Sequence, residues 1–456
     1  MERAEFLADV RPASGGKLLR VLGVTFGLAA AVGGTIGVGI LRNPGGVAEQ
    51  LGSYWLMMFA WVLGGLYCML GANYLAELAT MTPKAGGFYP HSHRAFGDYG
   101  GFIVGWSDWA NNTLALAYIS VVFGEYASVL FMPGWQWGRV VCSVSVLAII
   151  AGINMIGVRS GSGVQKVTAL IKCIALLAFV AACFAFGGGT TADAVPATAE
   201  PRGFFAGLMA FILAFQIVLG TYDGYYSPMY FCEEDTNPSR NIARSMFGGI
   251  ALITAIYLLV NIAILHVLPI SQVAASKFAG GDAMALIFGE TAGQLVTVLA
   301  LLSLIGILNA IMMSAPRIMF ALGRDGLFTS KADEVNRGGT PSFATITTAL
   351  TAIVLTILGT FDLLLAIGQF LIVVVMILLV IALFVLRRRE PDAPRPYRTW
   401  GYPFTPALML IFTVLLFIGY CVSNPYPSTL AAAALLLSYP LYRLAKRTTS
   451  QTGENA

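Results

Sequence analysis

Charged residues are scarce in this sequence. They make up 11% of its 456 residues, whereas soluble domains usually carry about 25%. Hydrophobic residues make up 57%, and the mean hydropathy is +0.77. So few charges cannot cover the surface of a water-soluble protein of this size, and so apolar a chain is not disordered. The composition therefore predicts a membrane protein.

Histidine is nearly absent, and cysteine follows no ligand spacing. The three His and six Cys include no CxxC pair, so they predict neither a metal site nor a disulfide scaffold. No HExxH, GxSxG or P-loop sequence occurs, so we expect neither an enzyme nor a cofactor. The net charge of +4 comes without a clustered basic face, which excludes nucleic acid as a partner.

Long apolar runs are abundant. A helix needs about 20 apolar residues to cross the hydrocarbon core of a bilayer. Such runs predict an all-α membrane protein with about twelve transmembrane helices, embedded in the lipid bilayer. The predicted spans are 21–48, 54–80, 98–131, 137–157, 162–187, 203–232, 241–268, 291–322, 342–361, 363–386, 403–422 and 427–444.

Lys and Arg are distributed unevenly between alternate loops. With the N-terminus in the cytoplasm, inside segments hold 22 of the 27 Lys and Arg and outside segments hold four, while Lys172 lies within a span. Cytoplasmic loops are enriched in Lys and Arg. The sequence therefore predicts a multi-pass protein of the cell membrane with both termini in the cytoplasm. The run Arg387–Arg389 fits this topological role.

Two spans are too rich in glycine to form regular helices at low cost. The first contains Gly-Gly-Thr-Ile-Gly-Val-Gly at 33–39, and the sixth contains Gly-Thr-Tyr-Asp-Gly at 220–224, followed by Pro228. Interrupted helices in corresponding positions of two halves indicate the binding site of a secondary transporter. The alternative is that these glycines only allow helices to pack closely.

Several motifs occur in an order that is typical of one family. Glu-Glu at 233–234 precedes Asn-Pro-Ser-Arg-Asn-Ile-Ala-Arg at 237–244. Further matches lie at 34–46, 77–89, 317–326 and 386–397. In these residues the chain resembles amino acid permeases of the amino acid–polyamine–organocation (APC) superfamily, close to the L-type amino acid transporters.

The resemblance implies a LeuT-like fold that works by alternating access, in which two groups of five helices form inverted repeats with helices 1 and 6 broken. The expected parts are a cytoplasmic segment 1–20, repeats 21–187 and 203–386, a cytoplasmic basic loop 387–402, helices 11 and 12 at 403–444, and a cytoplasmic tail 445–456.

Broken helices expose backbone groups that suit an amino acid. Amide N–H groups at a half-helix N-terminus favour a carboxylate, and carbonyls at a C-terminal end favour an ammonium. We therefore expect an amino acid to bind between the breaks. The candidate substrate-binding residues are Gly33, Gly37, Val38, Gly39, Leu219, Gly220, Tyr222, Asp223 and Tyr225.

The chain departs from the family at two places. Val38 stands where the family often has Ser, so one hydroxyl contact to the carboxylate is lost. Residues 217–220 lack the aromatic lid that the family commonly places at the second break. Tyr222 or Tyr225 could take its place.

Lys172 lies about ten residues into the fifth span, where a charge is costly and functional by default. The resemblance implies that its ammonium replaces a sodium ion, ties this helix to the first break and makes transport sodium-independent. The alternative is a lysine without a role, which extends its ammonium toward the membrane surface.

Two acids also lie within spans. Asp223 could face a cationic substrate, relay a proton or pair with a nearby donor. Asp108 could contact the substrate or form a helix-packing cluster with Asn111 and Asn112. Glu77, near the cytoplasmic end of its helix, is expected to anchor a loop or a gate.

These observations predict an amino acid permease, coupled to protons or working by exchange, with an amino acid as its small-molecule partner. A transporter of polyamines or other organic cations with the same fold is one alternative. A channel or a transporter-like sensor is the alternative from another class, although no repeated filter motif occurs.

Overall fold

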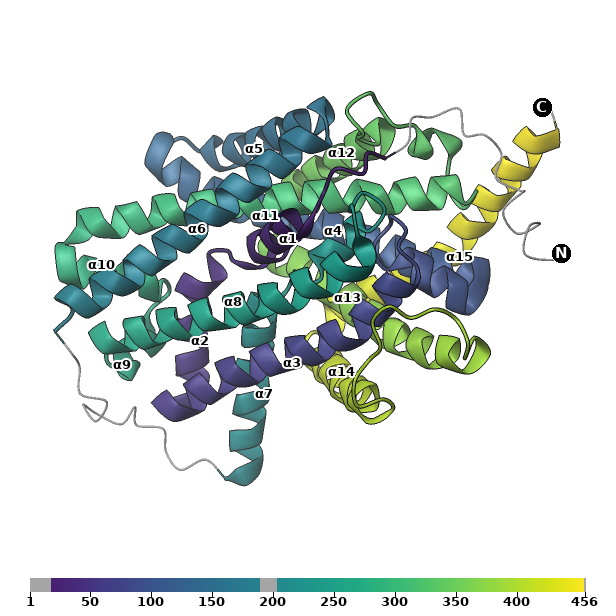
Figure 1. The fold of residues 1–456 in the computed structure, drawn as a ribbon. Helices are drawn as coiled ribbons and strands as arrows, with labels where there is room; N and C mark the ends of the chain where they lie inside the picture. The colour runs from purple at the N-terminus through teal and green to yellow at the C-terminus, as the bar shows by residue number, and fades with distance from the viewer. Residues whose placement is uncertain (1–17, 189–202, 455–456) are drawn as a thin grey trace.

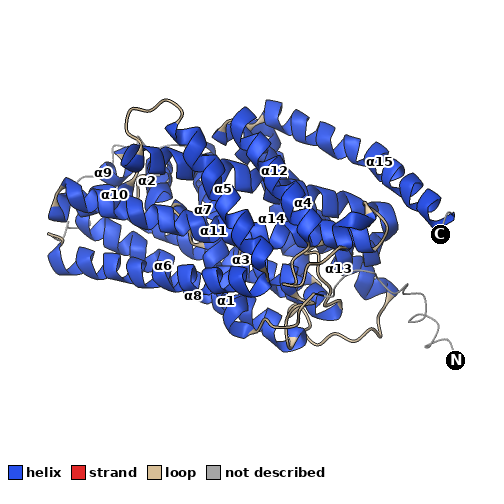
Figure 2. Cartoon of the chain, turned by 90° about the horizontal axis from the view of Figure 1, so that it is seen from above, coloured by secondary structure: helices blue, strands red, loops and turns tan. Residues whose placement is uncertain are grey.

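The protein is a bundle of long helices (Figure 1). The computed structural model describes residues 18–188 and 203–454. Within these ranges it contains α-helices, two short 3-10 helices and no β-sheet. Figure 2 shows the long helices packed side by side, with α15 along the outer edge of the bundle.

The observed helices follow the predicted spans closely. Those that coincide with them are α1 (Val24–Thr35), α2 (Gly39–Leu51), α3 (Tyr54–Met81), α4 (Tyr89–Phe131), α5 (Gly138–Ile156), α6 (Val158–Phe186), α7 (Phe204–Tyr222), α8 (Pro238–Val267), α11 (Glu290–Arg324), α12 (Ser342–Leu358), α13 (Phe361–Arg389), α14 (Phe404–Ser423) and α15 (Pro425–Glu454). The shorter elements are η2 (Ser227–Phe231), α9 (Ile270–Ala275), α10 (Ala279–Phe288) and η3 (Ser330–Asp333).

Ten of the twelve predicted spans have the length and composition of membrane-crossing segments. Nine are single helices of the described chain, with α7 and η2 counted together, and the bent pair α1–α2 is the tenth. The other two predicted spans are helical as α12, which has 17 residues, and α15. The protein is thus a multi-pass membrane protein, and the number twelve stays a prediction.

The helix boundaries differ from the prediction at three places. Helix α4 begins at Tyr89 rather than 98, with a left-handed Gly97 (φ 77°) between its two parts. Helices α9 and α10 occupy a segment where no span was predicted. Helix α15 continues to Glu454, past the predicted end at 444. In each case the added helix is polar or short, so it produces no long apolar run.

The two predicted helix breaks are present and touch each other. Helices α1 and α2 meet at a bend of 46° across residues 36–38. Helix α7 ends at Tyr222, and Gly224 then adopts a left-handed φ of 106°. A Cβ atom on Gly224 would lie 2.7 Å from the carbonyl oxygen of Gly34. Only glycine therefore allows this contact between the breaks.

Glu77 anchors the loop between α13 and α14, as predicted. Its buried carboxylate accepts hydrogen bonds from Arg387 (2.7 and 2.6 Å) and from the backbone N–H of Thr399 (2.7 Å), and it pairs with Arg395 at 3.0 Å. Arg387 therefore has a structural contact in addition to its expected topological role.

A second buried ion pair fixes the segment that follows the second break. Both side-chain oxygens of Glu234 accept hydrogen bonds from Arg317 on α11, at 2.8 and 3.2 Å. The backbone carbonyl of Glu234 also accepts the amide of Leu22, just before α1, at 3.0 Å. The segment before α1 and the segment after the second break are thus both tied to α11. Removing one member of such a buried pair typically costs about 3–5 kcal/mol.

Candidate functional site

Lys172 caps the C-terminal end of α1. The side chain is completely buried, and its Nζ donates hydrogen bonds to the carbonyls of Gly33 (2.8 Å) and Ile36 (2.7 Å). The last carbonyls of a helix lack partners within it. A buried lysine costs about 2.5–3.5 kcal/mol in a membrane, and each hydrogen bond to a charged group returns about 1.5–3 kcal/mol. The expected contact between Lys172 and the first break is confirmed.

Gly306 on α11 makes room for this ammonium. A Cβ atom at Gly306 would lie 2.7 Å from the Nζ atom of Lys172 and 2.8 Å from its Cε atom. Any larger residue would therefore displace the end of the lysine. Three helices, α1, α6 and α11, meet at this point.

Tyr257 of α8 joins the two broken helices. Its hydroxyl lies 3.1 Å from the carbonyl oxygen of Thr35, at the end of α1, and 2.9 Å from that of Thr221, near the end of α7. Asn43 of α2 adds a hydrogen bond to the hydroxyl of Thr221 at 2.7 Å. The ends of the broken helices therefore hold a fixed spacing.

The N-terminal end of α2 has backbone amides that no side chain caps. Its first amides have no carbonyl partner one turn earlier in the helix. Val38 and Gly39 are half-buried, whereas Gly37 is buried against Ile307. Such an end suits a carboxylate. The amides of Val38 and Gly39 are the more accessible ones.

The carbonyls at the C-terminal ends of α1 and α7, which could bind a substrate ammonium, differ in availability. Gly33 already accepts Lys172, and the carbonyl of Val32 accepts the amide of Ile36 at 2.8 Å. On α7, Leu219 is half-buried and Gly220 is exposed, with open space where a Cβ would stand. The α7 side of the break is therefore the more accessible one.

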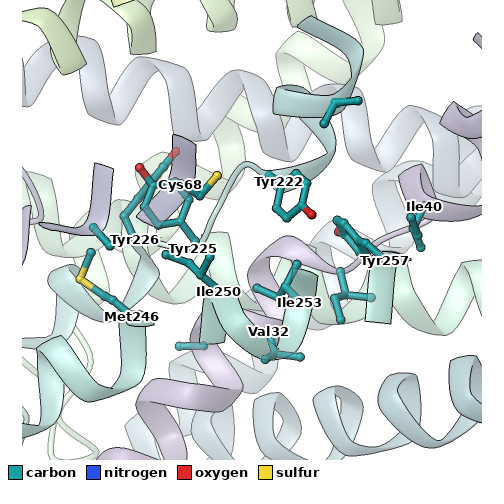
Figure 3. Close-up of a cluster of buried hydrophobic side chains, with 14 of the residues drawn as sticks. Val32, Ile40, Cys68, Tyr222, Tyr225, Tyr226, Met246, Ile250, Ile253 and Tyr257 are labelled. Atoms are coloured by element: carbon teal, nitrogen blue, oxygen red, sulfur yellow. The ribbon is translucent and has the colours of Figure 1, made fainter. Parts of the chain in front are cut away.

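Tyr222 and Tyr225 are packed into the core (Figure 3). The hydroxyl of Tyr222 donates to the carbonyl of Trp61 on α3 at 3.0 Å. The hydroxyl of Tyr225 lies against Gly71, where a Cβ would come within 2.1 Å of it. In this conformation both tyrosines contact α3, and their role as a lid stays a prediction.

Asp223 lies between α7 and η2 and is half-buried. Its Oδ1 accepts hydrogen bonds from the amide of Gly224 (3.0 Å) and from the hydroxyl of Tyr226 (2.8 Å). Among the described residues, no Lys or Arg forms an ion pair with it. The carboxylate is therefore available to a cationic group or a proton.

Asp108 lies in the middle of α4 and is fully buried. Its Oδ1 accepts hydrogen bonds from Tyr230 of η2 (2.7 Å) and from Asn112 (2.9 Å). Asn112 thus belongs to the expected cluster, whereas Asn111 lies against Gly368 of α13. The unexpected member is Tyr230, which connects Asp108 to the second break.

Sequence reasoning missed Tyr257, Gly306 and a polar chain beside Lys172. In this chain Asn309 of α11 donates to Gln165 (2.9 Å), and Gln165 donates to the carbonyl of Ala29 on α1 (3.2 Å). Amide and hydroxyl groups inside apolar spans need partners, so Tyr257, Gln165 and Asn309 carried a signal. Gly306 carried no such signal, because the residue that it contacts, Lys172, lies far away in the sequence.

The two broken helices, the buried lysine at the end of α1 and the polytopic bundle are typical of a membrane transport protein. A family profile described as amino acid permease matches residues 17–439. The chain therefore belongs to the amino acid permease family, within the APC superfamily. It is a transporter and not an enzyme.

Several named transporters are similar to this chain over most of their length. The serine/threonine exchanger SteT of Bacillus subtilis is 29% identical, with 93% of this chain and 96% of the relative covered. The human b(0,+)-type amino acid transporter 1 is 28% identical, with 93% and 87% covered. The mouse Asc-type amino acid transporter 1 is 26% identical, with 94% and 81% covered.

The contact between Gly306 and Lys172 gives a first prediction. Gly306→Ala should slow amino acid uptake by about tenfold or more, because the methyl group displaces the ammonium and weakens a charge-assisted hydrogen bond. Uptake into proteoliposomes measures this. Gly163→Ala is the control, since it adds the same methyl group to α6 in open space. Equal activity of both variants would contradict the prediction.

Proposed function

We propose that this protein is a sodium-independent amino acid permease that carries its substrate by alternating access around the two helix breaks. The observation that carries the proposal is the pair of hydrogen bonds from Lys172 to the carbonyls of Gly33 and Ile36. A fixed ammonium at these carbonyls occupies the position in which a sodium ion would need them as ligands. The substrate would then bind without a metal ion.

The LeuT-like arrangement of two inverted repeats belongs to this proposal. Its support is that the breaks lie in corresponding positions of 21–187 and 203–386 and contact each other. Residues near both ends of the described chain also contact the bundle. The amide of Leu22 donates to the carbonyl of Glu234, and Lys446 pairs with Asp98. We propose that the end of the bundle at these contacts faces the cytoplasm of the cell, with segments 1–20, 387–402 and 445–456 on that side and helices 403–444 added to the repeats.

We propose small neutral amino acids as the first substrates to test. The relatives named above include a serine/threonine exchanger and transporters of amino acids. In the proposed complex the substrate carboxylate meets the amides of Val38 and Gly39, and its ammonium meets the α7 side near Leu219 and Gly220. The more deeply buried part of the site would be formed by Gly33, Gly37, Tyr222 and Tyr225.

One observation favours a second candidate. The carboxylate of Asp223 is bound by an amide and a tyrosine hydroxyl but by no described cation. A cationic amino acid, a polyamine or another organic cation would supply the missing charge. The channel and sensor alternatives have no comparable observation in their favour.

Uptake into proteoliposomes tests the proposal as a whole. A panel of radiolabelled amino acids and polyamines should give saturable uptake for at least one neutral amino acid, because alternating access binds one substrate per cycle. Flux that rises linearly with concentration would indicate a channel. Absence of flux for every compound, with binding retained, would indicate a sensor.

Sodium replacement tests the role of Lys172. Exchanging external sodium for choline at fixed pH should leave uptake unchanged, because the ammonium is part of the protein. Lys172→Ala should abolish uptake by a protein that is still folded, whereas Lys166→Ala, on an exposed position of the same helix, should remain active. A strict sodium requirement, or full activity of Lys172→Ala, would overturn this role.

Asp223→Asn tests which side chains the site accepts. The change preserves the shape but removes the charge, so it should weaken uptake of cationic substrates more than that of neutral ones. The expected difference is on the order of 1.5–3 kcal/mol, the usual contribution of a hydrogen bond to a charged group. Competition of unlabelled lysine and unlabelled serine with a labelled substrate measures the affinity for a cationic and for a neutral amino acid in the same variant. An equal loss for both substrates would argue for a structural or proton-handling role instead.

A further inference from the structure

Of the buried acids in the described residues, Asp108 and Asp235 have no arginine partner, and Asp235 lies just before α8, where it accepts the amide of Asn237 at 2.7 Å. Glu77 and Glu234 are paired with arginines. Asp108 is equally buried, yet the partners of its Oδ1 atom are the neutral groups of Tyr230 and Asn112. Among the described residues no Lys or Arg forms an ion pair with it. An ionised carboxylate without a cation is expensive at this depth in a membrane.

The helices around α4 supply no compensating charge. Helix α12 contains no charged residue, and α5 and α13 have theirs only at their ends. Helix α11 contributes Arg317 and, at its end, Arg324, whose guanidinium groups are bound by Glu234 and Glu233. Helix α15 contributes Lys446, which pairs with the exposed Asp98.

The remaining titratable groups near Asp108 come from the second break. Tyr230 and Tyr226 lie within or next to η2, with ring centroids 6.5 Å apart. Tyr226 donates to Asp223 at 2.8 Å, and Tyr230 donates to Asp108 at 2.7 Å. The two acids therefore sit at opposite ends of one short helix, and each is held by a tyrosine of that segment.

The turn before α4 is shaped to admit this cluster. Gly87 has a left-handed φ of 60°, and a Cβ there would lie 2.2 Å from the ring of Tyr230 and 3.0 Å from Oδ2 of Asp108. Phe88 covers both tyrosine rings, with centroids 5.1 and 5.6 Å away. The carboxyl group is thus sealed between α4, η2 and this turn.

We propose that Asp108 is the proton-binding site of this permease. This inference rests on the proposed function and deepens it, because it selects proton coupling over pure amino acid exchange. The carboxylate takes one proton from water on one side of the membrane while the site is open there. Asp108 then stays neutral while the site is closed to both sides. When the site opens to the other side, the proton leaves to water there.

The hydrogen bond from Tyr230 links this proton to the substrate site. An ionised Asp108 accepts a strong hydrogen bond from the hydroxyl of Tyr230. A protonated Asp108 is a weaker acceptor and carries an O–H donor of its own. Protonation therefore changes how firmly η2 is held against α4. Because η2 follows the break directly, substrate affinity becomes dependent on pH.

The wild-type protein provides the first test. In proteoliposomes that contain a pH-sensitive dye, addition of L-serine, or of the fastest substrate in the panel, should acidify the interior as uptake proceeds. A pH gradient, acidic outside, should drive accumulation, and a protonophore should abolish it. Uptake or exchange without either effect would overturn the proton site and leave the permease function intact. No uptake of any substrate would overturn both.

The apparent substrate affinity at a series of pH values provides the second test. One linked proton changes the affinity by up to about tenfold per pH unit. Asp108→Asn should make the affinity independent of pH, whereas Asp362→Asn, an exposed acid at the start of α13, should keep the wild-type dependence. A pH dependence that survives in folded Asp108→Asn would assign the proton to another group and overturn the proposal.

Tyr230→Phe keeps the test decisive if Asp108→Asn does not fold. The ionised carboxylate then loses a donor, so the midpoint of the pH profile should move to higher pH. The acid itself remains, and proton uptake should persist in this variant. An unchanged midpoint in folded Tyr230→Phe would contradict the proposed link.

Discussion

A helix that ends inside a membrane leaves carbonyl groups that water cannot satisfy, and the structure depends on how this is solved at the end of α1. Lys172 reaches from α6 and binds two of these carbonyls. Tyr257 reaches from α8 and approaches a third. Unsatisfied backbone groups cost several kcal/mol each in a bilayer. The break persists because neighbouring helices complete it, so it is a property of the bundle and not of α1 alone.

The two helix breaks contact each other and are therefore structurally coupled. Gly224 lies against Gly34, and Tyr257 lies within hydrogen-bond distance of the last turns of both α1 and α7. A displacement of either half-helix therefore changes the hydrogen bonds of the other. The ion pair between Glu234 and Arg317 extends this coupling to α11. Alternating access, as proposed, needs parts that move together, and these contacts supply them.

The sequence predicted the features that leave a local trace. Glycine runs marked both breaks, apolar runs marked the spans, and the family resemblance assigned Lys172 to the end of α1. It could not predict Gly306 or Tyr230, because their importance comes from side chains on helices far away in the chain. It also left Tyr222 and Tyr225 as equal candidates for the aromatic lid, because the sequence of a broken helix does not reveal which side chains face α3. In the structure, both tyrosines contact α3.

Lys172 and the acids Asp108 and Asp223 lie at two different places in the bundle and have different partners. The one buried lysine of the described chain is bound to backbone carbonyls of α1, so its charge is stabilised by dipoles that move with that helix. Asp108 and Asp223 are held instead by tyrosines of the η2 segment. In the proposed function, the positive charge fixed at the first break takes the place of a metal ion there. The two acids held by the η2 segment form no ion pair with a Lys or Arg of the described chain, and the proposed proton coupling is therefore assigned to this group and not to Lys172.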